Sequence, residues 1–432
     1  MSKTSTPLRA SASPRENSDK PALVPKLRFP EFRGAKGWEN KLVGPYLEDC
    51  SGRVPPDTEL PVYSSTREGL KRQDAYFDGQ VLQNKNEYGV VPPGCLVYRH
   101  MSDDGLFKFN INETGGDIAV SKEYPVFTTK DLNPVFLLAK LNEGIDFKHF
   151  ALSQKAGGTR TRLYFSRLCE WRTLLPSAAE QQKIAECLSS VDELMAAQAR
   201  KVDALKTHKK GLMQQLFPRE GETQPRLRFP EFQNAGEWVS DSLGNIFETT
   251  SGGTPSRTEK AYWNGDIPWI TTSLVDFRVI TSAEEFITAE GLENSSAKLF
   301  PKGTVLMAMY GQGKTRGQVA LLGIEAATNQ ACAAILPRKG IDPYFVFLNL
   351  AGRYEEIREL SNSGGQENLS QGLVREIRFA FPPDDDEQRK VTECLSSLDA
   401  LITAETQKHE ALKTHKKGLM QQLFPSPEEV EA

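Results

Sequence analysis

The stretch "LKTHKKGLMQQLFP" occupies residues 205–218, and the same fourteen residues return at 412–425. A stretch of this length that is spelled twice indicates a duplicated chain, and internal repeats decide architecture before any other pattern does. Both copies end in proline, which cannot continue the hydrogen-bond ladder of a helix. The stretch therefore predicts the last turns of two equivalent helices.

The repeat extends to both ends of each copy but skips the middle. Matching segments are "LRFPEF" at 27 and 227, Trp38 and Trp238, Ser51-Gly52 and Ser251-Gly252, Glu180-Gln181 and Glu387-Gln388, and "ECLSS" at 186 and 393. Between these ends the two middles, each of roughly 100 residues, do not match. Shared ends with unrelated middles suggest one scaffold that presents two different surfaces. A duplication whose loops diverged neutrally would leave the same pattern.

The shared exit of each copy predicts a long amphipathic helix. Apolar residues recur by fours and threes at Ile184, Leu188, Val191, Met195, Val202, Leu205, Leu212 and Leu216, and again at Val391, Leu395, Leu398, Ile402, Leu412, Leu419 and Leu423. This is a coiled-coil pattern, which Gln198, Lys209, Glu405, His409 and Lys416 interrupt. Ser177 with Glu180, and Asp384 with Glu387, predict capping boxes at the starts. About 37 residues at 1.5 Å each give a rod of about 55 Å.

Charge favours antiparallel pairing of the two helices. The first half of each is acidic and the last half basic, as with Asp192 and Glu193 against Lys413, Lys416 and Lys417. Antiparallel packing puts acid beside base at both ends, whereas parallel packing puts like beside like. The expected fold is α/β, with two α/β domains joined by an antiparallel coiled coil in a pseudo-twofold internal repeat. Two separate helices, each packed on its own domain, are the alternative.

Composition indicates a soluble protein with no global attraction for polyanions. The 432 residues carry 53 Lys plus Arg against 57 Asp plus Glu, a net charge of -4, so any nucleic-acid contact must be local. The six cysteines form no CxxC pair, which is typical of reduced thiols in a cytoplasm, and a metal site is not expected. The sequence has no apolar run long enough to span a membrane, and the N-terminal tail lacks the apolar core of a signal peptide.

The second middle predicts strands joined by turns. "KGTVLMAMYGQGKTRGQVALLG" at 302–323 predicts two apolar strands around a polar glycine loop. The loop resembles a phosphate-binding loop, but a second strand follows it instead of a helix, so a nucleotide site is rejected. Four positive charges lie in or just before this segment, namely Lys298, Lys302, Lys314 and Arg316, and they suit contacts to phosphate or guanine.

The first middle holds a comparable basic segment. Residues 148–172 contain one acid, Glu170, and the aromatic residues Tyr164 and Phe165. Their basic residues are Lys148, Lys155, Arg160, Arg162, Arg167 and Arg172. Basic charge interleaved with aromatic residues suits a nucleic-acid surface. A solvated strand edge whose cations prevent aggregation explains the same residues.

The sequence offers no catalytic constellation. "NPVF" at 133–136 differs from the signature of amino-methyltransferases because Val135 replaces a proline, and no glycine-rich cofactor loop precedes it. "FPPDDDEQRK" at 381–390 has the carboxylates of a nuclease, but Asp384 and Glu387 are assigned to helix capping. The five histidines have no ligand spacing, and three lie in the helices.

Taken together, these motifs resemble the specificity subunit of type I restriction-modification systems. The resemblance rests on the two helical exits ending in "LKTHKKGLMQQLFP", on "LRFPEF" with the following tryptophan, on "SGGTPSRTEKAYWNGDIPWIT" and on "GKTRGQVALLGIEAATNQACAAILP". The Ser, Pro and charge content of the first residues predicts a disordered tail (1–26). With the resemblance, the expected organisation after it is target recognition domain 1 (27–176), a central conserved helix (177–218), a linker (219–226), target recognition domain 2 (227–382), a distal conserved helix (383–425) and a tail (426–432).

The resemblance implies a non-catalytic subunit that reads a split DNA site, with one domain per half-site. The helices would fix the half-site separation, about 34 Å for successive major grooves, and would dock two modification subunits. Those partners would bind S-adenosylmethionine and methylate adenine N6. Restriction subunits would use ATP and Mg²⁺, and this chain would bind no cofactor itself. A coiled-coil scaffold with two peptide-binding domains, or a stand-alone methyltransferase, are the rival functions.

Candidate DNA contacts follow from the positions implied by the family resemblance and from side-chain chemistry. Arg pairs with guanine, Asn and Gln with adenine, and Ser and Thr with phosphate. In the first domain they are Tyr63, Ser64, Ser65, Thr66, Arg67, Arg99, Gly158, Arg160 and Arg162. In the second domain they are Ser256, Arg257, Thr272, Ser273, Tyr310, Gln312, Lys314, Arg316, Asn329 and Gln330.

Overall fold

The computed structural model describes residues 24–76, 87–155, 160–219, 221–311, 314–360 and 368–425. Its contacts divide the chain into two compact units. The first unit combines the chain up to residue 197 with residues from 409 onward, and the second unit comprises residues 198–408. Each unit therefore contains part of both copies of the repeat.

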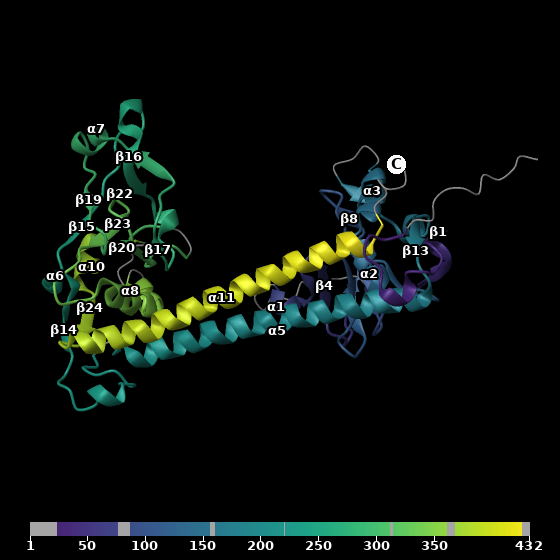
Figure 1. Cartoon of the computed structure of the whole chain (residues 1–432), viewed down its shortest axis with the longest axis horizontal. Helices are drawn as coiled ribbons and strands as arrows, with labels where there is room; N and C mark the ends of the chain where they lie inside the picture. The colour runs from purple at the N-terminus through teal and green to yellow at the C-terminus, as the bar shows by residue number, and fades with distance from the viewer. Residues whose placement is uncertain are drawn as a thin grey trace, which may run out of the picture. The chain divides into compact units, whose positions relative to one another are not determined.

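Two long helices run through the chain. They are α5 (Ala178–Leu216) and α11 (Asp385–Leu423), 39 residues each, or about 58 Å at 1.5 Å per residue (Figure 1). Both end at the leucine of the repeated "LFP", immediately before the phenylalanine and proline, as the sequence predicts. In the described part of the chain, neither these helices nor any other is long and apolar enough to span a membrane.

Within each unit the two helices pack antiparallel. In the first unit Lys416 Nζ contacts Asp192 Oδ1 at 2.7 Å. In the second unit Lys209 Nζ contacts Asp399 Oδ1 at 2.6 Å, and Gln198 donates to Glu405 Oε2 at 2.6 Å. As the residue number on α5 rises, its partner's number on α11 falls. The predicted antiparallel pairing is confirmed, and polar residues that interrupt the apolar seam become its cross-helix pairs.

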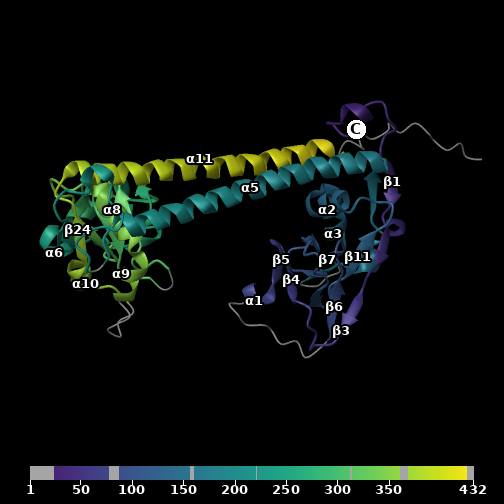
Figure 2. The ribbon, with the colours of Figure 1, turned by 90° about the horizontal axis from the view of Figure 1, so that it is seen from below.

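The first unit consists of small antiparallel sheets, short helices and the parts of α5 and α11 that belong to it. Two-stranded sheets pair β1 (Glu39–Leu42) with β13 (Arg172–Leu175), β12 (Thr161–Arg162) with β8 (Met101–Ser102), and β4 (Tyr63–Thr66) with β5 (Gly69–Arg72). A three-stranded sheet has the strand order β10 (Ile118–Ser121), β6 (Tyr88–Val91), β3 (Gly52–Val54). A four-stranded sheet has the strand order β2 (Leu47–Asp49), β11 (Val126–Thr129), β7 (Leu96–Tyr98), β9 (Phe109–Ile111). The short helices of this unit are α1 (Gln73–Tyr76), α2 (Pro134–Glu143), α3 (Ile145–Ser153) and α4 (Phe165–Leu168). Helix α2 lies beside the strands of this unit (Figure 2), and apolar residues of α2, α5 and α11 share one core with the strands.

The second unit has larger sheets, which combine antiparallel and parallel strand pairs. A two-stranded sheet pairs β14 (Val239–Ser242) with β24 (Arg378–Phe381). A five-stranded sheet has the strand order β15 (Thr249–Ser251), β23 (Cys332–Ile335), β20 (Val305–Ala308), β21 (Val319–Leu322), β17 (Val279–Ile280). A four-stranded sheet has the strand order β18 (Glu285–Ile287), β16 (Trp263–Ile270), β22 (Ala326–Thr328), β19 (Leu299–Phe300). The short helices of this unit are α6 (Leu243–Ile246), α7 (Ala289–Glu293), α8 (Pro343–Gly352), α9 (Tyr354–Leu360) and α10 (Gln371–Glu376). The predicted hairpin is confirmed, because β20 pairs antiparallel with β21.

Each repeated helix end completes the core of the unit built on the other copy. Phe424, at the end of the second copy, lies 6.0 Å from Trp38 and 5.5 Å from Phe136, ring centre to ring centre. Phe217, at the end of the first copy, lies 5.2 Å from Phe345 in the second unit. The Leu27 N–H likewise donates to the Gln422 carbonyl, and the Leu227 N–H to the Gln215 carbonyl, both at 2.9 Å. The helices are therefore exchanged between the two halves of the duplication.

A buried ion pair fixes the start of each long helix. Glu180, 1% exposed, accepts from Arg28 Nε at 2.8 Å and Nη2 at 2.7 Å, and from the Trp38 indole at 3.2 Å. The second unit repeats this with Glu387, Arg228 and Trp238 at 2.7, 2.6 and 3.1 Å. The "LRFPEF" segment and its tryptophan thus recur because they bind the helix glutamate.

These pairs correct the predicted capping boxes. Ser177 Oγ does accept from the Glu180 N–H at 3.3 Å, and Asp384 Oδ1 accepts from the Asp386 N–H at 2.8 Å. The carboxylates of Glu180 and Glu387, however, turn to buried arginines instead of reaching back to the helix start. An arginine that cannot be solvated is a stronger partner for a carboxylate than an exposed backbone N–H.

Candidate nucleic-acid interface

Three loops of the second unit meet at one edge of its sheets. Strands β16 and β22 are parallel and in register at Ile270 and Thr328, so the residues after each strand emerge side by side. The Asn329 N–H donates to the Ile270 carbonyl at 3.2 Å, and the Gly253 N–H to the Thr328 carbonyl at 2.8 Å. This edge brings together predicted contacts from distant parts of the sequence, namely Ser256, Arg257, Thr272, Ser273, Asn329 and Gln330.

The loop at residues 252–258 is pinned at several points. The indoles of Trp269 and Trp263 donate to the carbonyls of Gly253 and Ser256, both at 3.0 Å. Thr254 Oγ1 donates to Gln330 Oε1 at 2.6 Å, which joins this loop to the one after β22. Its exposed hydroxyls are therefore presented on a fixed backbone, as a binding surface requires.

Gly252 and Gly253 are needed for close backbone approach. A Cβ on Gly253 would lie 2.3 Å from Ser296, and a Cβ on Gly252 would lie 2.0 Å from the Thr328 carbonyl oxygen. Both contacts are with neighbouring chain and cannot be relieved by rotating a side chain. The "SGG" of the sequence is thus explained by packing.

Gly253→Ala is expected to destabilise the second unit by about 1–3 kcal/mol, because the added methyl group forces the backbone apart. The measurement is urea unfolding of the full chain, with hydrogen exchange to locate the loss. Gly236→Ala in the same unit is the matched control, since a Cβ there meets nothing within 4 Å. Equal effects of the two substitutions would contradict the packing explanation.

Arg257 lies over an aromatic surface next to this loop. Its Cζ is 3.8 Å from the ring centre of Trp263 and 4.9 Å from that of Trp269. The guanidinium also forms an ion pair with Glu285, and its side chain remains 54% exposed. Stacking and the ion pair together fix the orientation of a cation at the surface.

The tip of the β20–β21 hairpin places further predicted residues near this edge. The Met309 N–H donates to the Ala331 carbonyl at 2.8 Å, so Tyr310, 45% exposed, follows directly beside the loop after β22. Lys314 is exposed, Arg316 is half-buried, and the Tyr354 hydroxyl donates to the Lys314 carbonyl. Gln312 lies outside the described residues.

In the first unit, predicted contacts form one hairpin. Tyr63, Ser64, Ser65 and Thr66 make up β4, and Arg67 begins the turn to β5. Ser65 is buried and accepts from Asn110 Nδ2 at 2.8 Å, and the same Nδ2 donates to the Thr66 carbonyl at 3.1 Å. The Ser65 hydroxyl thus helps to attach the hairpin to β9, while Arg67 projects from its tip.

Two aspartates each bind one of the predicted arginines of this unit. Arg67 Nη2 contacts both carboxylate oxygens of Asp104 at 2.6 Å, and Arg160 Nε contacts Asp103 Oδ1 at 2.8 Å. Asp104 also accepts from Ser102 Oγ at 2.8 Å and from the Leu106 N–H at 3.1 Å. The hydrogen bonds from Arg67, Ser102 and Leu106 hold the pKa of Asp104 well below its usual range, so it is ionised at neutral pH.

A small cavity of about 100 Å³ lies beside these pairs. Arg67, Arg99, Lys108, Asp103 and Ser65 are among the residues that line it. Arg99 is exposed, and Arg162 is exposed on β12, whose partner strand β8 leads into the aspartates. Predicted arginines from three chain segments therefore gather here. Gly158 lies outside the described residues.

Sequence reasoning missed the residues that orient these cations. Asp103, Asp104, Asn110, Trp263 and Glu285 are absent from the predicted set, although "SDDG" at 102–105 is a typical turn signal. Their partners are separated from them in sequence by 28 residues or more, except for Arg257 and Trp263, so no local spacing identifies the pairs.

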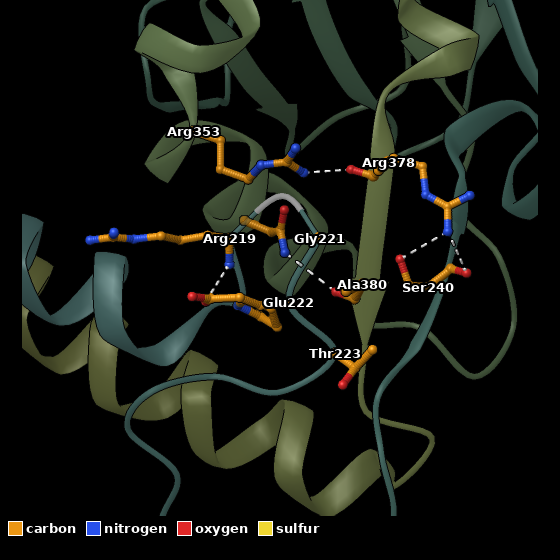
Figure 3. A pocket seen from close by; sticks show the side chains of 10 residues that line it. Arg219, Gly221, Glu222, Thr223, Ser240, Arg353, Arg378 and Ala380 are labelled. Atoms are coloured by element: carbon orange, nitrogen blue, oxygen red, sulfur yellow. Dashed lines mark hydrogen bonds between the residues drawn. The ribbon is translucent and has the colours of Figure 1, made fainter.

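Another cavity in the second unit, of about 140 Å³, lies where the chain leaves α5 (Figure 3). Arg353 and Arg378 line it, but Arg353 Nη1 donates to the Arg378 carbonyl and Arg378 Nη2 donates to the Ser240 carbonyl at 3.1 Å. Their guanidinium groups join neighbouring chain segments, as the dashed contacts in Figure 3 show. The cavity therefore lies where the linker packs against β24, and its arginines have structural contacts.

The chemistry of both surfaces is that of hydrogen bonding and charge. Among the described residues, no group of three or more His, Cys, Asp or Glu side chains is placed to hold a metal ion. The exposed groups are hydroxyls, amides and guanidinium groups, which recognise phosphates and base edges.

Comparison with known proteins gives a family match for the region that contains the second-unit surface. Residues 235–414 match a family model described as type I restriction modification DNA specificity domain. The type I restriction enzyme MjaIX specificity subunit of Methanocaldococcus jannaschii is 30% identical over 182 residues, which is 41% of this chain and 41% of that protein. The EcoR124I/EcoR124II specificity subunit of Escherichia coli is 28% identical over 177 residues, 40% of this chain and 43% of that protein. The matches span about two fifths of the length of these curated relatives.

A solved structure extends the likeness in fold to nearly the whole chain. The S subunit of the type I restriction-modification system from M. genitalium aligns with a TM-score of 0.54 and 16% identity, covering 94% of this chain and 100% of that one. The expected fold, with α/β domains and two long helices, is confirmed. Residues 235–414 therefore match the family of type I restriction modification DNA specificity domains, and the chain as a whole has the fold of a solved type I S subunit.

Proposed function

We propose that this chain reads a bipartite DNA sequence for a type I restriction-modification enzyme, each unit recognising one half-site. One observation carries the proposal. The region that matches a DNA specificity domain contains the edge where the loops after β15, β16 and β22 present Arg257, Ser273 and Gln330 together. These are the side-chain types that bind guanine, phosphate and adenine.

The first unit supports the same role with different residues. Its arginine cluster occupies the divergent middle of the repeat, while the buried ion pairs and the helix ends are shared. Two readers of different sequence on one repeated scaffold would recognise an asymmetric split site. The long helices would then set the spacing between the half-sites.

We further propose that the partners carry the chemistry. Two modification subunits would dock on the scaffold, bind S-adenosylmethionine and methylate adenine, and restriction subunits would add ATP- and Mg²⁺-dependent cutting. This chain would bind DNA and those subunits and no cofactor of its own.

The decisive experiment combines the full chain with its modification subunits and a pool of random duplex DNA. We expect methylated adenines to appear only in two short motifs at a fixed separation, and binding to weaken steeply as salt rises, because phosphate contacts release counterions. Methylation by this chain alone, heat released on titration of this chain with S-adenosylmethionine, or salt-insensitive binding would each contradict the proposal. The last outcome would favour a peptide-binding scaffold.

Arg316 gives a residue-level prediction in the second unit. If it contacts a base, Arg316→Ala should cost about 1–3 kcal/mol of binding and relax the preference at one position of one half-site. The measurement is competition binding with duplexes changed at each position in turn. Equal weakening on all sequences would instead identify a phosphate contact.

A further inference from the structure

Five arginines of the proposed interface fall into two groups. Arg67, Arg160 and Arg257 each form an ion pair with a carboxylate, yet their side chains remain 66%, 53% and 54% exposed. Arg99 and Arg162 are also exposed, and no carboxylate pairs with them in the described part of the chain. An ion pair with a carboxylate lowers the net charge that an arginine presents to DNA, and it also fixes the orientation of the guanidinium.

A carboxylate beside an arginine nearly cancels its charge as seen by a distant phosphate. The pair then adds little to the general attraction for DNA, which depends on the number of phosphates neutralised. The donors, however, stay in place and become oriented. A fixed orientation is required for a two-point contact with the O6 and N7 atoms of guanine, whereas a phosphate can also be bound by a simple positive charge.

Arg67 is held by a carboxylate that is itself fixed by hydrogen bonds. Asp104 engages only Nη2, so Nε and Nη1 have no hydrogen-bond partner within the described ranges. Asp104 is itself fixed by Ser102 Oγ and by the Leu106 N–H, and Asn110 attaches the hairpin behind Arg67 to β9. The carboxylate that binds the Arg67 guanidinium and the hairpin that carries Arg67 are therefore each held by further hydrogen bonds.

From this geometry we propose that Arg67 reads a base, and that Asp104 is a positioning residue that orients it. Arg99, which lines the same cavity, contacts phosphate. The inference rests on the proposed function and deepens it, because it assigns specificity in the first unit to a neutral, oriented pair and affinity to the unpaired cations.

The test uses the full chain with its modification subunits and the duplex that the wild-type complex selects. We expect Arg67→Ala to reduce discrimination at one base pair by about 5- to 150-fold, with little change in the salt dependence of binding. Arg99→Ala is the matched control: it should weaken binding to all duplexes equally and lower the salt slope by about one unit. Arg67→Lys keeps the charge and loses the fork, so it should behave like Arg67→Ala.

Asp104→Ala distinguishes orientation from charge, because the two act in opposite directions. Removing an acid next to DNA should by charge alone strengthen binding to every duplex. As a positioning residue, Asp104 should instead lose discrimination at the same base pair as Arg67, and the double variant should be no worse than Arg67→Ala alone. Asp104→Asn, which keeps an acceptor for the Leu106 N–H, controls for loop folding.

Two outcomes would overturn the inference. One is equally strengthened binding of Asp104→Ala to all duplexes, and the other is a salt slope for Arg67→Ala that falls as it does for Arg99→Ala. Failure of the proposed function looks different, because the wild-type complex would then select no duplex at all. That result would contradict both the proposed function and this inference.

Discussion

Replacing Leu423 and Phe424 together with alanine is expected to unfold the first unit while leaving the second unit intact. Leu423 is 1% exposed and Phe424 9% exposed, and both belong to the core around Trp38 and Phe136. Large-to-small changes at such sites cost about 2–5 kcal/mol each, so together they cost about 5–8 kcal/mol after coupling. That loss is comparable to the whole stability of a typical domain.

Hydrogen exchange of the full chain, read by mass spectrometry, locates the loss. Peptides from residues 96–141 should lose protection, although the substitutions lie at the opposite end of the sequence. The repeat provides the matched control, Leu216→Ala with Phe217→Ala, which should instead expose peptides of the second unit because Phe217 packs on Phe345. Loss of protection in both units from either variant would contradict the exchange of helix ends.

Glu180→Ala is expected to lower the free energy of unfolding of the first unit by about 3–5 kcal/mol. The reason is the charge left behind, since Arg28 is 5% exposed and the two nitrogens that now contact Glu180 would have no carboxylate partner. The Trp38 indole would lose its acceptor as well. Urea unfolding followed by tryptophan fluorescence measures the change.

Two comparisons make this second prediction specific. Glu186→Ala lies on the same helix at an exposed site, so it should change stability by less than about 0.5 kcal/mol. Glu387→Ala should reproduce the loss in the second unit, where Arg228 and Trp238 take the same positions. A similar cost for Glu180→Ala and Glu186→Ala would mean that the buried pair contributes little beyond helix formation.

Much of the architecture was predictable because its signals are periodic or repeated. Ile184, Leu188 and the matching residues of the second copy identify the long helices, and the charges of Asp192 and Lys416 indicate their direction. The capping boxes were only partly right. Ser177 and Glu180 have the right spacing for a cap, but spacing does not reveal that Arg28 competes for the same carboxylate.

The candidate interface was predictable only as residue types. Arg67, Arg160 and Arg257 stand out as cations in polar segments, whereas their carboxylate partners do not. Asp104 is 37 residues from Arg67, and Asp103 is 57 residues from Arg160. A pair of that separation depends on how strands are ordered in a sheet, and strand order is not written in local sequence.

The sequence by itself determined the duplication, the two helices and their antiparallel sense, because hydrophobic period and charge act locally along the chain. Only the tertiary structure decided which helix end completes which unit, where the glutamates of the helix starts point, and which arginines are oriented. These features depend on contacts between residues far apart in sequence. The stretch "LKTHKKGLMQQLFP" illustrates both sides: its residues predict a helix end, and its position in the fold places that end in the core of the opposite half.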